Sequence, residues 1–396
     1  MEQMVLEHLL AQVRDRLEHD DIDGAVRIIE SLRPADQAEL FSELPPEQQE
    51  DLLTQLDIED SADILEKLED EEAAELASQL DIDTLASILD EMEPDEAADL
   101  LGDLPPEQVF QALSHMADAD EVRPLLLHPD ETAGGLMTSE FLALRQDMTA
   151  AQALAAIRQW APEREDIHYF FVVNQEGKLV GVVSLTRLLV ADPWVRLRDL
   201  MDPDVIHVHT SADQEKCARL MARYDLLALP VVDDEGHLVG VITVDDLVDV
   251  LEDEATEDIQ RLGGAEPLGR PYLDTNVVTI AWKRVGWLLL LFVTATLTGT
   301  VMRFFQQELD RVVALTFFIP LLIGTGGNAG SQTTATVIRA LAVGDISTRD
   351  ALRVLWHEMR AGVLLGLMLS GVAFLRAITW GTGPNLALAV GVSILA

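Results

Sequence analysis

The apolar positions of this chain follow three patterns, and each pattern occupies its own stretch of the sequence. In residues 1–130, leucine, isoleucine and alanine recur at helical spacing within short segments. In residues 131–252, short valine- and leucine-rich runs flank glycine turns, which is typical of β-hairpins. In residues 271–396, the apolar runs are long enough to cross a bilayer. This division predicts a multidomain membrane protein with an all-α helical solenoid, an α/β tandem repeat and an α-helical transmembrane bundle.

Helix-start residues divide residues 1–130 into short units. They are Pro34, Pro45, Asp57, Asp70, Asp81, Pro94 and Pro105. Each unit opens with an acidic turn, which suits the helix dipole, and a proline in the first turn needs no amide partner. Leucines then follow at helical spacing, so we expect short helices stacked in a solenoid. Its predicted core residues are Leu52, Leu53, Leu56, Ile64, Leu65, Leu68, Leu76, Leu80, Leu85, Ile88 and Leu89.

The middle part contains a sequence repeat. Phe170 to Gly181 matches Leu229 to Gly240, and Leu136-Met137 matches Leu200-Met201. In each copy two apolar runs flank a glycine, Gly177 or Gly236, so a hairpin with a turn at that glycine is expected. A helical segment follows each hairpin. The repeat predicts two similar strand–turn–strand–helix modules.

An acidic segment, assigned to residues 245–270, connects the repeat to the apolar part. Its first stretch has eight acidic residues from Asp245 to Asp258 and no basic residue. On a helix, four of these acids lie on one face, where like charges repel: Asp246, Asp249, Asp253 and Glu257. Carboxylate oxygens are the ligands that Mg²⁺ and Ca²⁺ take, and a divalent cation would reverse the repulsion. The alternative is a solvated helix that leads to the membrane.

Four apolar segments are expected in the last third of the chain. They are 282–305, 312–343, 352–378 and 384–396. Basic residues gather before the first segment and between the second and third, so the positive-inside rule places the N-terminal domains in the cytosol. His357 and Glu358 begin the third segment, where a titratable pair is either functional or at the membrane interface.

The second apolar segment is rich in glycine and polar side chains. Backbone breaks within a membrane are tolerated where they line a wet cavity, and the freed carbonyls can coordinate cations. We therefore expect a glycine-broken permeation element; the alternative is a close helix contact through Gly326 and Gly330. The predicted pore residues are Pro320, Gly324, Gly326, Gly327, Asn328, Gly330 and Gln332.

Charge and composition narrow the function classes. The net charge is −43, and residues 1–130 hold 38 of the acidic side chains but only six basic ones, so nucleic-acid binding is excluded. The single Cys217 fits a reducing compartment. The first ten residues lack a basic region before an apolar core, which argues against a cleaved signal peptide. The chain carries no GxSxG, Walker or HExxH motif, so an enzyme is not expected.

The tandem repeat resembles a pair of CBS domains, a module that often senses nucleotides. In that family a Ser/Thr-x-x-Asp sequence after the second strand contacts ribose. The second copy keeps it at Thr243 and Asp246, whereas the first copy has Ser184 and Arg187. The resemblance therefore leaves two interpretations open: ATP binding at Thr243 and Asp246, or no nucleotide.

The acidic helical domain, CBS pair, acidic connecting helix and Gly-Thr-Gly-Gly-Asn-x-Gly span together resemble the MgtE family of magnesium channels over the whole chain. The resemblance implies a homodimer in the lipid of the plasma membrane, with multiple spans, cytosolic N-terminal domains and Mg²⁺ uptake. It implies that several cytosolic Mg²⁺ ions bridge the helical domain, the CBS pair and the connecting (plug) helix, and so close the pore. The family has five spans with a pore carboxylate in the last, so we expect this chain, which stops in the fourth, to be C-terminally incomplete.

The resemblance also implies metal ligands, carried over residue by residue. They are Asp63, Asp95 and Asp99 in the helical domain, Gly135 (by its backbone carbonyl), Glu215 and Asp225 in the CBS pair, and Asp246, Asp249, Glu254, Glu257 and Asp258 on the connecting helix. Two alternatives remain. One is a transporter of another divalent cation (Mn²⁺, Co²⁺ or Ca²⁺), although oxygen-only ligands disfavour a soft metal. The other is a membrane-tethered nucleotide sensor whose spans serve only as an anchor.

Overall fold

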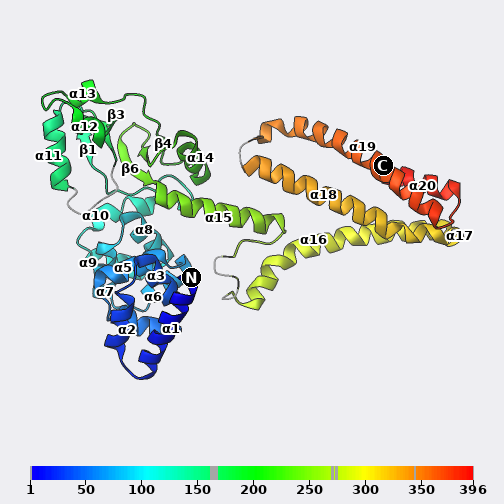
Figure 1. Cartoon of the computed structure of the whole chain (residues 1–396), viewed down its shortest axis with the longest axis horizontal. Helices are drawn as coiled ribbons and strands as arrows, with labels where there is room; N and C mark the ends of the chain where they lie inside the picture. Colours follow the sequence, from blue (N-terminus) through cyan, green and yellow to red (C-terminus); the bar gives the residue numbers. More distant parts are fainter. Residues whose placement is uncertain (1, 161–167, 269–271, 273–274, 343–344, 396) are drawn as a thin grey trace. The chain divides into compact units, whose positions relative to one another are not determined.

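The chain divides into two compact units, Met1–Glu254 and Ala255–Ala396 (Figure 1). The computed structural model describes residues 2–160, 168–268, 272, 275–342 and 345–395. The first unit contains an array of short helices followed by two α/β modules, and the second consists of helices. The predicted fold class is therefore confirmed.

The N-terminal array is built from short helices that stack on their second neighbours. The elements are α1 (Glu2–Glu18), α2 (Ile22–Ile29), α3 (Pro34–Ser42), α4 (Pro46–Leu53), α5 (Ile58–Lys67), α6 (Asp70–Ala77), α7 (Ile82–Glu91), α8 (Pro94–Asp103), α9 (Pro106–His115), α10 (Ala119–Val122) and the 3₁₀ turn η1 (Leu125–Leu127). Helix α3 packs on α5, α5 on α7 and α7 on α9, while α4 packs on α6 and α6 on α8. The odd and even helices therefore form two stacked rows, as a solenoid requires.

The predicted helix-start positions of this array are confirmed. Pro34, Asp70 and Pro94 are the first residues of helices, and the other predicted start residues are N-caps. All eleven predicted core residues are buried. Burial of one leucine side chain contributes about 1.5–3 kcal/mol, so this stripe is the main source of stability of the array.

The two α/β modules have the same topology. The first contains β1 (Ala143–Arg145), α11 (Ala150–Trp160), β2 (Tyr169–Val173), β3 (Leu179–Ser184) and α12 (Leu185–Val190). The second follows α13 (Leu197–Leu200) and contains β4 (Val208–His209), α14 (Gln214–Tyr224), β5 (Ala228–Val232), β6 (Leu238–Thr243) and α15 (Val244–Leu262). In each three-stranded sheet the first pair of strands is parallel and the second is an antiparallel hairpin. Gly177 and Gly236 both have φ +85°, which explains glycine at each turn.

The repeated Leu-Met pair has a packing role that joins the modules. A Cβ on Gly240 would lie 2.5 Å from Met137, and a Cβ on Gly181 would lie 2.4 Å from the Met201 sulfur. The methionine before each module thus rests on a glycine in the hairpin of the other module. The Thr138 amide donates to the Val241 carbonyl (2.9 Å), and the Val182 amide donates to the Asp202 carbonyl (2.9 Å). The two modules therefore exchange their leading segments and form one pair.

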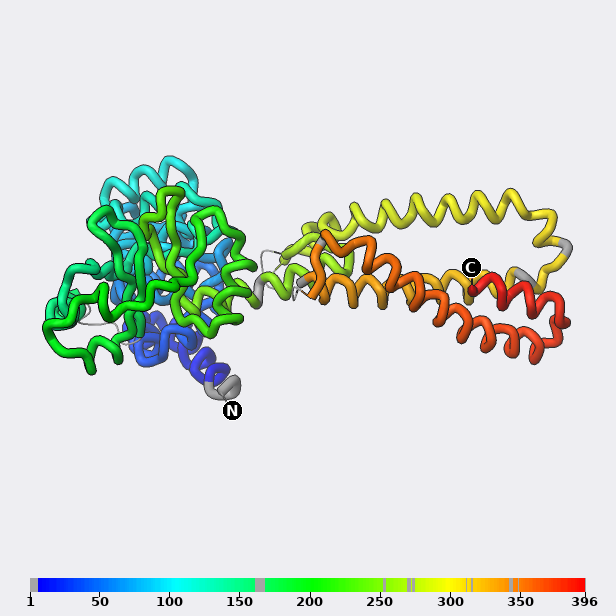
Figure 2. The backbone as a smooth tube through the Cα atoms, turned by 90° about the horizontal axis from the view of Figure 1, so that it is seen from above, coloured from blue at the N-terminus to red at the C-terminus, as the bar shows by residue number. Residues whose placement is uncertain are grey.

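The second unit is helical. Its elements are α16 (Val277–Phe304), α17 (Gln306–Arg311), η2 (Val313–Phe317), α18 (Ile319–Ala342), η3 (Thr348–Asp350), α19 (Ala351–Thr379) and α20 (Pro384–Leu395). Among the described residues, α16 and α19 have the length and apolar composition to cross a membrane, and α20 is a shorter apolar helix. Helices α19 and α20 lie side by side (Figure 2). Their contact buries a cluster of Ala373, Ala377, Ala387 and Val390 with Phe318.

The predicted glycine break in the second apolar segment is wrong. Helix α18 is a continuous α-helix over 24 residues and contains every predicted pore residue. Glycine lowers helix stability by about 1 kcal/mol in water, but an unbroken helix satisfies every backbone group in an apolar segment. The close-contact alternative also finds no support within the chain, because a Cβ on Gly324, Gly326, Gly327 or Gly330 would meet nothing within 4 Å among the described residues.

Candidate metal-binding interface

The acidic first turn of α8 is buried rather than solvated. Its N-cap residue Glu93 donates its backbone amide to the Glu66 carboxylate (2.7 Å), which ties the end of α5 to the start of α8. Asp95 is only 6% exposed, and its Oδ1 has no hydrogen-bond partner among the described residues. Burial, with a further contribution from the charge of Asp246, raises the pKa of Asp95 well above its ordinary value. A buried carboxylate without a partner is costly unless it is protonated or binds a cation.

Two more acids on the same helix share this environment. Burial raises the pKa of Glu96 to about 8 although Lys67 opposes the shift. Burial and the charges of Asp130 and Asp95 raise the pKa of Asp99 to about 8. Raised carboxylate pKa values of this size are typical of functional sites. They mean that the surroundings disfavour the negative charge of the carboxylate, which a bound cation would stabilise.

The facing acids come from the start of α15. The Asp246 carboxylate accepts hydrogen bonds from the Thr243 amide (3.1 Å) and hydroxyl (2.7 Å), which is half of a capping box. Burial raises the pKa of Asp246 even though these hydrogen bonds lower it. The predicted nucleotide-contacting pair, Thr243 and Asp246, is therefore internally hydrogen-bonded, and Asp246 lies close enough to α8 to act on Asp95 and Glu96.

Lys67, the last residue of α5, supplies a positive charge to this acidic surface. Burial lowers the pKa of Lys67, but the charges of Glu96, Asp249 and other acids outweigh burial, so the pKa is raised overall. Lys67 is therefore charged at neutral pH. We name the set Asp95, Glu96, Asp99, Asp246 and Asp249, together with Lys67, the α8–α15 surface.

The remaining predicted ligands of the first unit lie around this surface or on α14. Asp63 is half-buried on α5, and burial followed by the charges of Asp60 and Glu59 raises its pKa. Gly135 is buried beside Asp130, and a Cβ there would lie 2.7 Å from the backbone of Asp130. Because the charge of Asp130 acts on Asp99, the Gly135 loop borders the α8–α15 surface.

The predicted ligands on α14 and later in α15 are more dispersed. Glu215 forms an ion pair with Arg219 (3.0 Å), and the neighbouring Gln214 donates to Glu254 (2.8 Å), so the start of α14 contacts α15. Asp225 is exposed and ends α14 with a left-handed φ of 52°. Glu257 pairs with Arg261, and both Glu257 and Asp258 are half-buried on the part of α15 that belongs to the second unit.

The structure gathers predicted ligands onto one surface without closing them into a metal cage. Within the described residues, two groups bring three potential ligands together: Asp233 with Glu235 and His237, and Glu30 with Asp57 and Asp60. Neither contains a predicted ligand. Sequence reasoning also missed Lys67, Glu96 and Asp130; the acidic Pro94-Asp-Glu turn was a signal for Glu96, whereas Lys67 and Asp130 carry no local signal.

In the second unit, polar groups on α18 and α19 meet near one end. The Thr333 hydroxyl donates to the Glu358 carboxylate (3.0 Å). A cavity of about 550 Å³ between these helices is lined by Thr336, Asp345, Arg353, His357 and Glu358 among others. The titratable pair His357 and Glu358 thus borders a cavity that also touches the polar side of the glycine-rich helix.

Family models match three stretches of the chain. A model of the MgtE intracellular N domain matches residues 32–131, CBS domain models match 133–193 and 197–253, and a divalent cation transporter model matches 319–396. The magnesium transporter MgtE of Thermus thermophilus is 45% identical over 289 residues, which are 72% of this chain and 64% of that protein. The chain has the domain composition of the MgtE family. The resemblance inferred from the sequence is confirmed.

A second MgtE relative and a solved MgtE domain are also similar to this chain. The magnesium transporter MgtE of Bacillus subtilis is 34% identical over 279 residues, 70% of this chain and 61% of that protein. The chain therefore spans 64% and 61% of the lengths of these two relatives. The solved cytosolic domain of the Mg²⁺ channel MgtE in complex with ATP is 39% identical, with a TM-score of 0.57, and covers 61% of this chain and 99% of its own. The model that matches residues 319–396 and the full-length relatives named above are those of transporters.

Proposed function

We propose that this chain belongs to a Mg²⁺-selective channel or transporter for Mg²⁺ uptake that is gated by cytosolic Mg²⁺. The acidic α8–α15 surface is the observation that carries the proposal, since it concentrates buried and half-buried carboxylates with raised pKa values between the N-terminal array and the CBS pair. The protein is a multi-pass, homodimeric protein of the plasma membrane with the first unit in the cytosol. Apolar helices α16 and α19 support the membrane assignment.

The proposed gate is electrostatic. Two like charges 4 Å apart repel by about 4 kcal/mol near a protein surface. The ionised acids of α8 and α15 therefore destabilise the contact between the two helices when no metal is bound. Mg²⁺ takes carboxylate oxygens and keeps several waters, so it can bridge acids that do not form a closed cage. Bound Mg²⁺ then holds the N-terminal array against α15 and favours a closed pore, whereas low Mg²⁺ favours the open state.

The proposed regulatory ligands are the carboxylates and the Gly135 carbonyl that the resemblance implies. Within the first unit, Asp95, Asp99 and Asp246 have the best support, because they share one surface and burial disfavours their bare charge. The proposed pore residues lie on α18. The oxygen-only ligand set favours Mg²⁺, and flux competition with Mn²⁺, Co²⁺ and Ca²⁺ distinguishes the alternative cargoes.

ATP is proposed as a second ligand of the CBS pair, near Thr243 and Asp246. The support is the solved ATP complex of a related cytosolic domain and the retained Thr-x-x-Asp sequence. Asp246 would then serve both ATP and Mg²⁺. Calorimetric titration of the purified chain with ATP, with and without Mg²⁺, tests ATP binding. The absence of a binding heat in both conditions contradicts it.

The gating proposal is tested by Asp246→Ala combined with Asp249→Ala. We expect the Mg²⁺ concentration for half-closure to rise by at least about fivefold, because a coupling of this kind amounts to roughly 1–3 kcal/mol. The measurement is Mg²⁺ flux through reconstituted protein at varied Mg²⁺ on the cytosolic side. The matched control is Glu47→Ala with Glu50→Ala, which removes the same charge from exposed positions on α4. Equal closure in the double variant and in wild type contradicts the proposal.

A further inference from the structure

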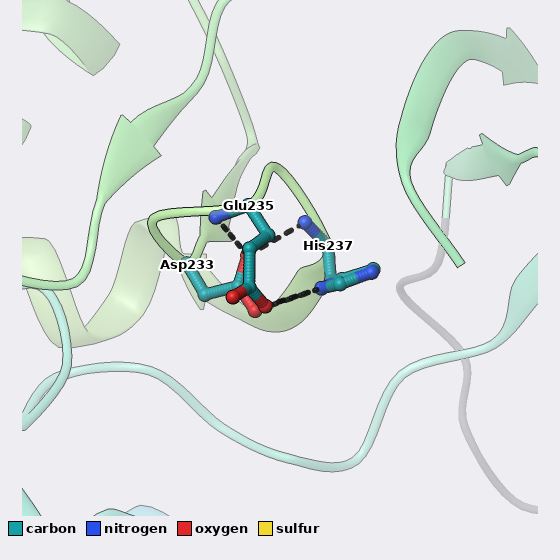
Figure 3. A group of neighbouring side chains, drawn as sticks. All are labelled: Asp233, Glu235 and His237. Atoms are coloured by element: carbon teal, nitrogen blue, oxygen red, sulfur yellow. Dashed lines mark hydrogen bonds and ion pairs between the residues drawn. The ribbon is translucent and has the colours of Figure 1, made fainter. Parts of the chain in front are cut away.

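The turn between β5 and β6 holds a cluster of potential metal ligands that the gating proposal does not use. Asp233, Glu235 and His237 each place one ligand atom within 4.8 Å of the others (Figure 3). The three side chains point to the same side of the turn. The neighbouring Asp234 pairs with Nε2 of His209 on β4 (2.8 Å), so a second imidazole lies at the same corner of the sheet.

The equivalent turn of the first module shows which of these side chains the backbone needs. There the Asn174 side-chain oxygen accepts from the amides of Glu176 (2.8 Å) and Lys178 (3.0 Å). In the second module Oδ1 of Asp233 accepts from the amides of Glu235 (2.9 Å) and His237 (2.8 Å). The same turn therefore forms with Asn and Lys in place of Asp and His, so turn formation does not account for the acid–imidazole pair.

The spacing of the ligand atoms fits one metal ion. Nδ1 of His237 lies 2.9 Å from Oδ2 of Asp233 and 3.6 Å from Oε2 of Glu235. An ion bound about 2.0–2.2 Å from nitrogen and oxygen ligands holds neighbouring ligand atoms about 3–3.5 Å apart. The ion would replace the proton that His237 shares with Asp233, and the turn bonds to Oδ1 of Asp233 would remain.

We propose that Asp233, Glu235 and His237 form a binding site for a borderline divalent transition metal, of the Zn²⁺, Co²⁺ or Ni²⁺ class. One imidazole nitrogen with two carboxylate oxygens suits these ions better than Mg²⁺, which prefers oxygen ligands alone. The remaining coordination positions are open to water because Glu235 is largely exposed. This site is independent of the α8–α15 surface and of the gating proposal.

The site lies where the two CBS turns meet. The Leu179 amide donates to the Gly236 carbonyl (3.1 Å), and the Leu238 amide donates to the Gly177 carbonyl (3.2 Å). A metal that links residues 233 and 237 stabilises this turn and, through these hydrogen bonds, the junction between the modules. Metal binding should therefore raise the melting temperature of the chain, since it favours the folded state.

The test uses Co²⁺ as a spectroscopic probe with the purified, chelator-treated full chain. The variant Asp233→Asn with His237→Lys gives the second turn the Asn and Lys of the first, so it removes two ligands while keeping a turn that the fold already contains. Glu235→Ala is a second variant, which removes one ligand and its ion pair with His237 but leaves the turn's hydrogen bonds to Asp233 in place. We expect wild type to bind one more Co²⁺ equivalent than the double variant, with a visible d–d band that the double variant lacks.

The strength of the effect is also predicted. Loss of ligands should weaken Co²⁺ binding at this site by at least about tenfold, since even outer-shell changes cost that much. Excess Mg²⁺ should not abolish the d–d band. The same Co²⁺ stoichiometry and spectrum in wild type and in both variants would overturn the proposal, as would complete displacement of Co²⁺ by equimolar Mg²⁺.

Discussion

At the residue scale, the acids that matter are distinguished by their neighbours rather than by their type. Asp95 and Asp246 were predicted as ligands from motifs, and both are buried or half-buried in the structure. Lys67 had no signal in the sequence, because its acidic neighbours come from α8 and α15 as well as from its own helix. Local patterns predict helices and their caps, whereas the charge around a side chain depends on contacts between distant segments.

Lys67 should act as a built-in counter-charge of the α8–α15 surface. Lys67→Met should weaken the contact of α8 with α15 in the absence of Mg²⁺ by a few tenths of a kcal/mol up to about 1 kcal/mol, the range for exposed opposite charges. Protease resistance of the chelator-treated chain should therefore fall, and saturating Mg²⁺ should restore it. Lys67→Arg keeps the charge and is the control; equal resistance of the Met variant and wild type in chelator contradicts this role.

Two glycines give a matched test of backbone packing. Gly135→Ala places a Cβ 2.7 Å from the backbone of Asp130, so the loop must shift, and we expect a loss of about 1–3 kcal/mol in stability. Gly102→Ala on α8 meets nothing within 4 Å and should stabilise the helix by about 0.5–1 kcal/mol. Thermal melts of the two variants should shift in opposite directions; a common direction contradicts the packing account.

At the element scale, short amphipathic helices and hairpins were predictable because their signals are local. Helices α3 to α9 each begin at or beside a predicted Pro or Asp, and each hairpin turns at its glycine. Helix α18 was mispredicted because glycine content was taken as a sign of a break, although an apolar segment gains from keeping every backbone hydrogen bond. The connecting helix, predicted within residues 245–270, ends at Leu262 before Gly263 and Gly264.

The contact between α8 and α15 should depend on pH when metal is absent. Glu96 and Asp99 have folded-state pKa values of about 8, above their ordinary values near 4, so the folded contact binds more protons than the separated state. Its stability is fully present below about pH 4 and is lost as pH rises towards about 8. Hydrogen exchange of α8 in chelator should therefore be slower at about pH 5.5 than at about pH 8, after correction for intrinsic rates.

Mg²⁺ should remove most of that pH dependence, because it replaces protons at the same carboxylates. The control is Asp95→Asn with Asp99→Asn, which should exchange in chelator at about pH 8 more slowly than wild type. If α8 in chelator exchanged faster at about pH 5.5 than at about pH 8, after the same correction, the assigned direction of the pKa shifts would be contradicted.

At the scale of the whole molecule, the sequence predicted the order of the domains along the chain. It did not predict that the N-terminal array and the second CBS module share one hydrophobic core. Residues of the array, such as Leu125, share one hydrophobic cluster with Ala133, Met137 and Val208 near the second CBS module. The first module has a separate cluster around Leu144 and Val172. The array and the second module are thus packed as one body, which brings α8 to α15; each part alone gives no sequence signal for this contact.

The most direct test compares hydrogen exchange of α8 and of residues 244–254 of α15 in the full chain, with chelator and with millimolar Mg²⁺ at about pH 8. The account predicts that Mg²⁺ slows exchange in both segments together, and that Asp246→Ala with Asp249→Ala abolishes the slowing while Glu47→Ala with Glu50→Ala preserves it. Identical exchange of both segments in chelator and in Mg²⁺ would contradict a gate that closes by metal binding between them.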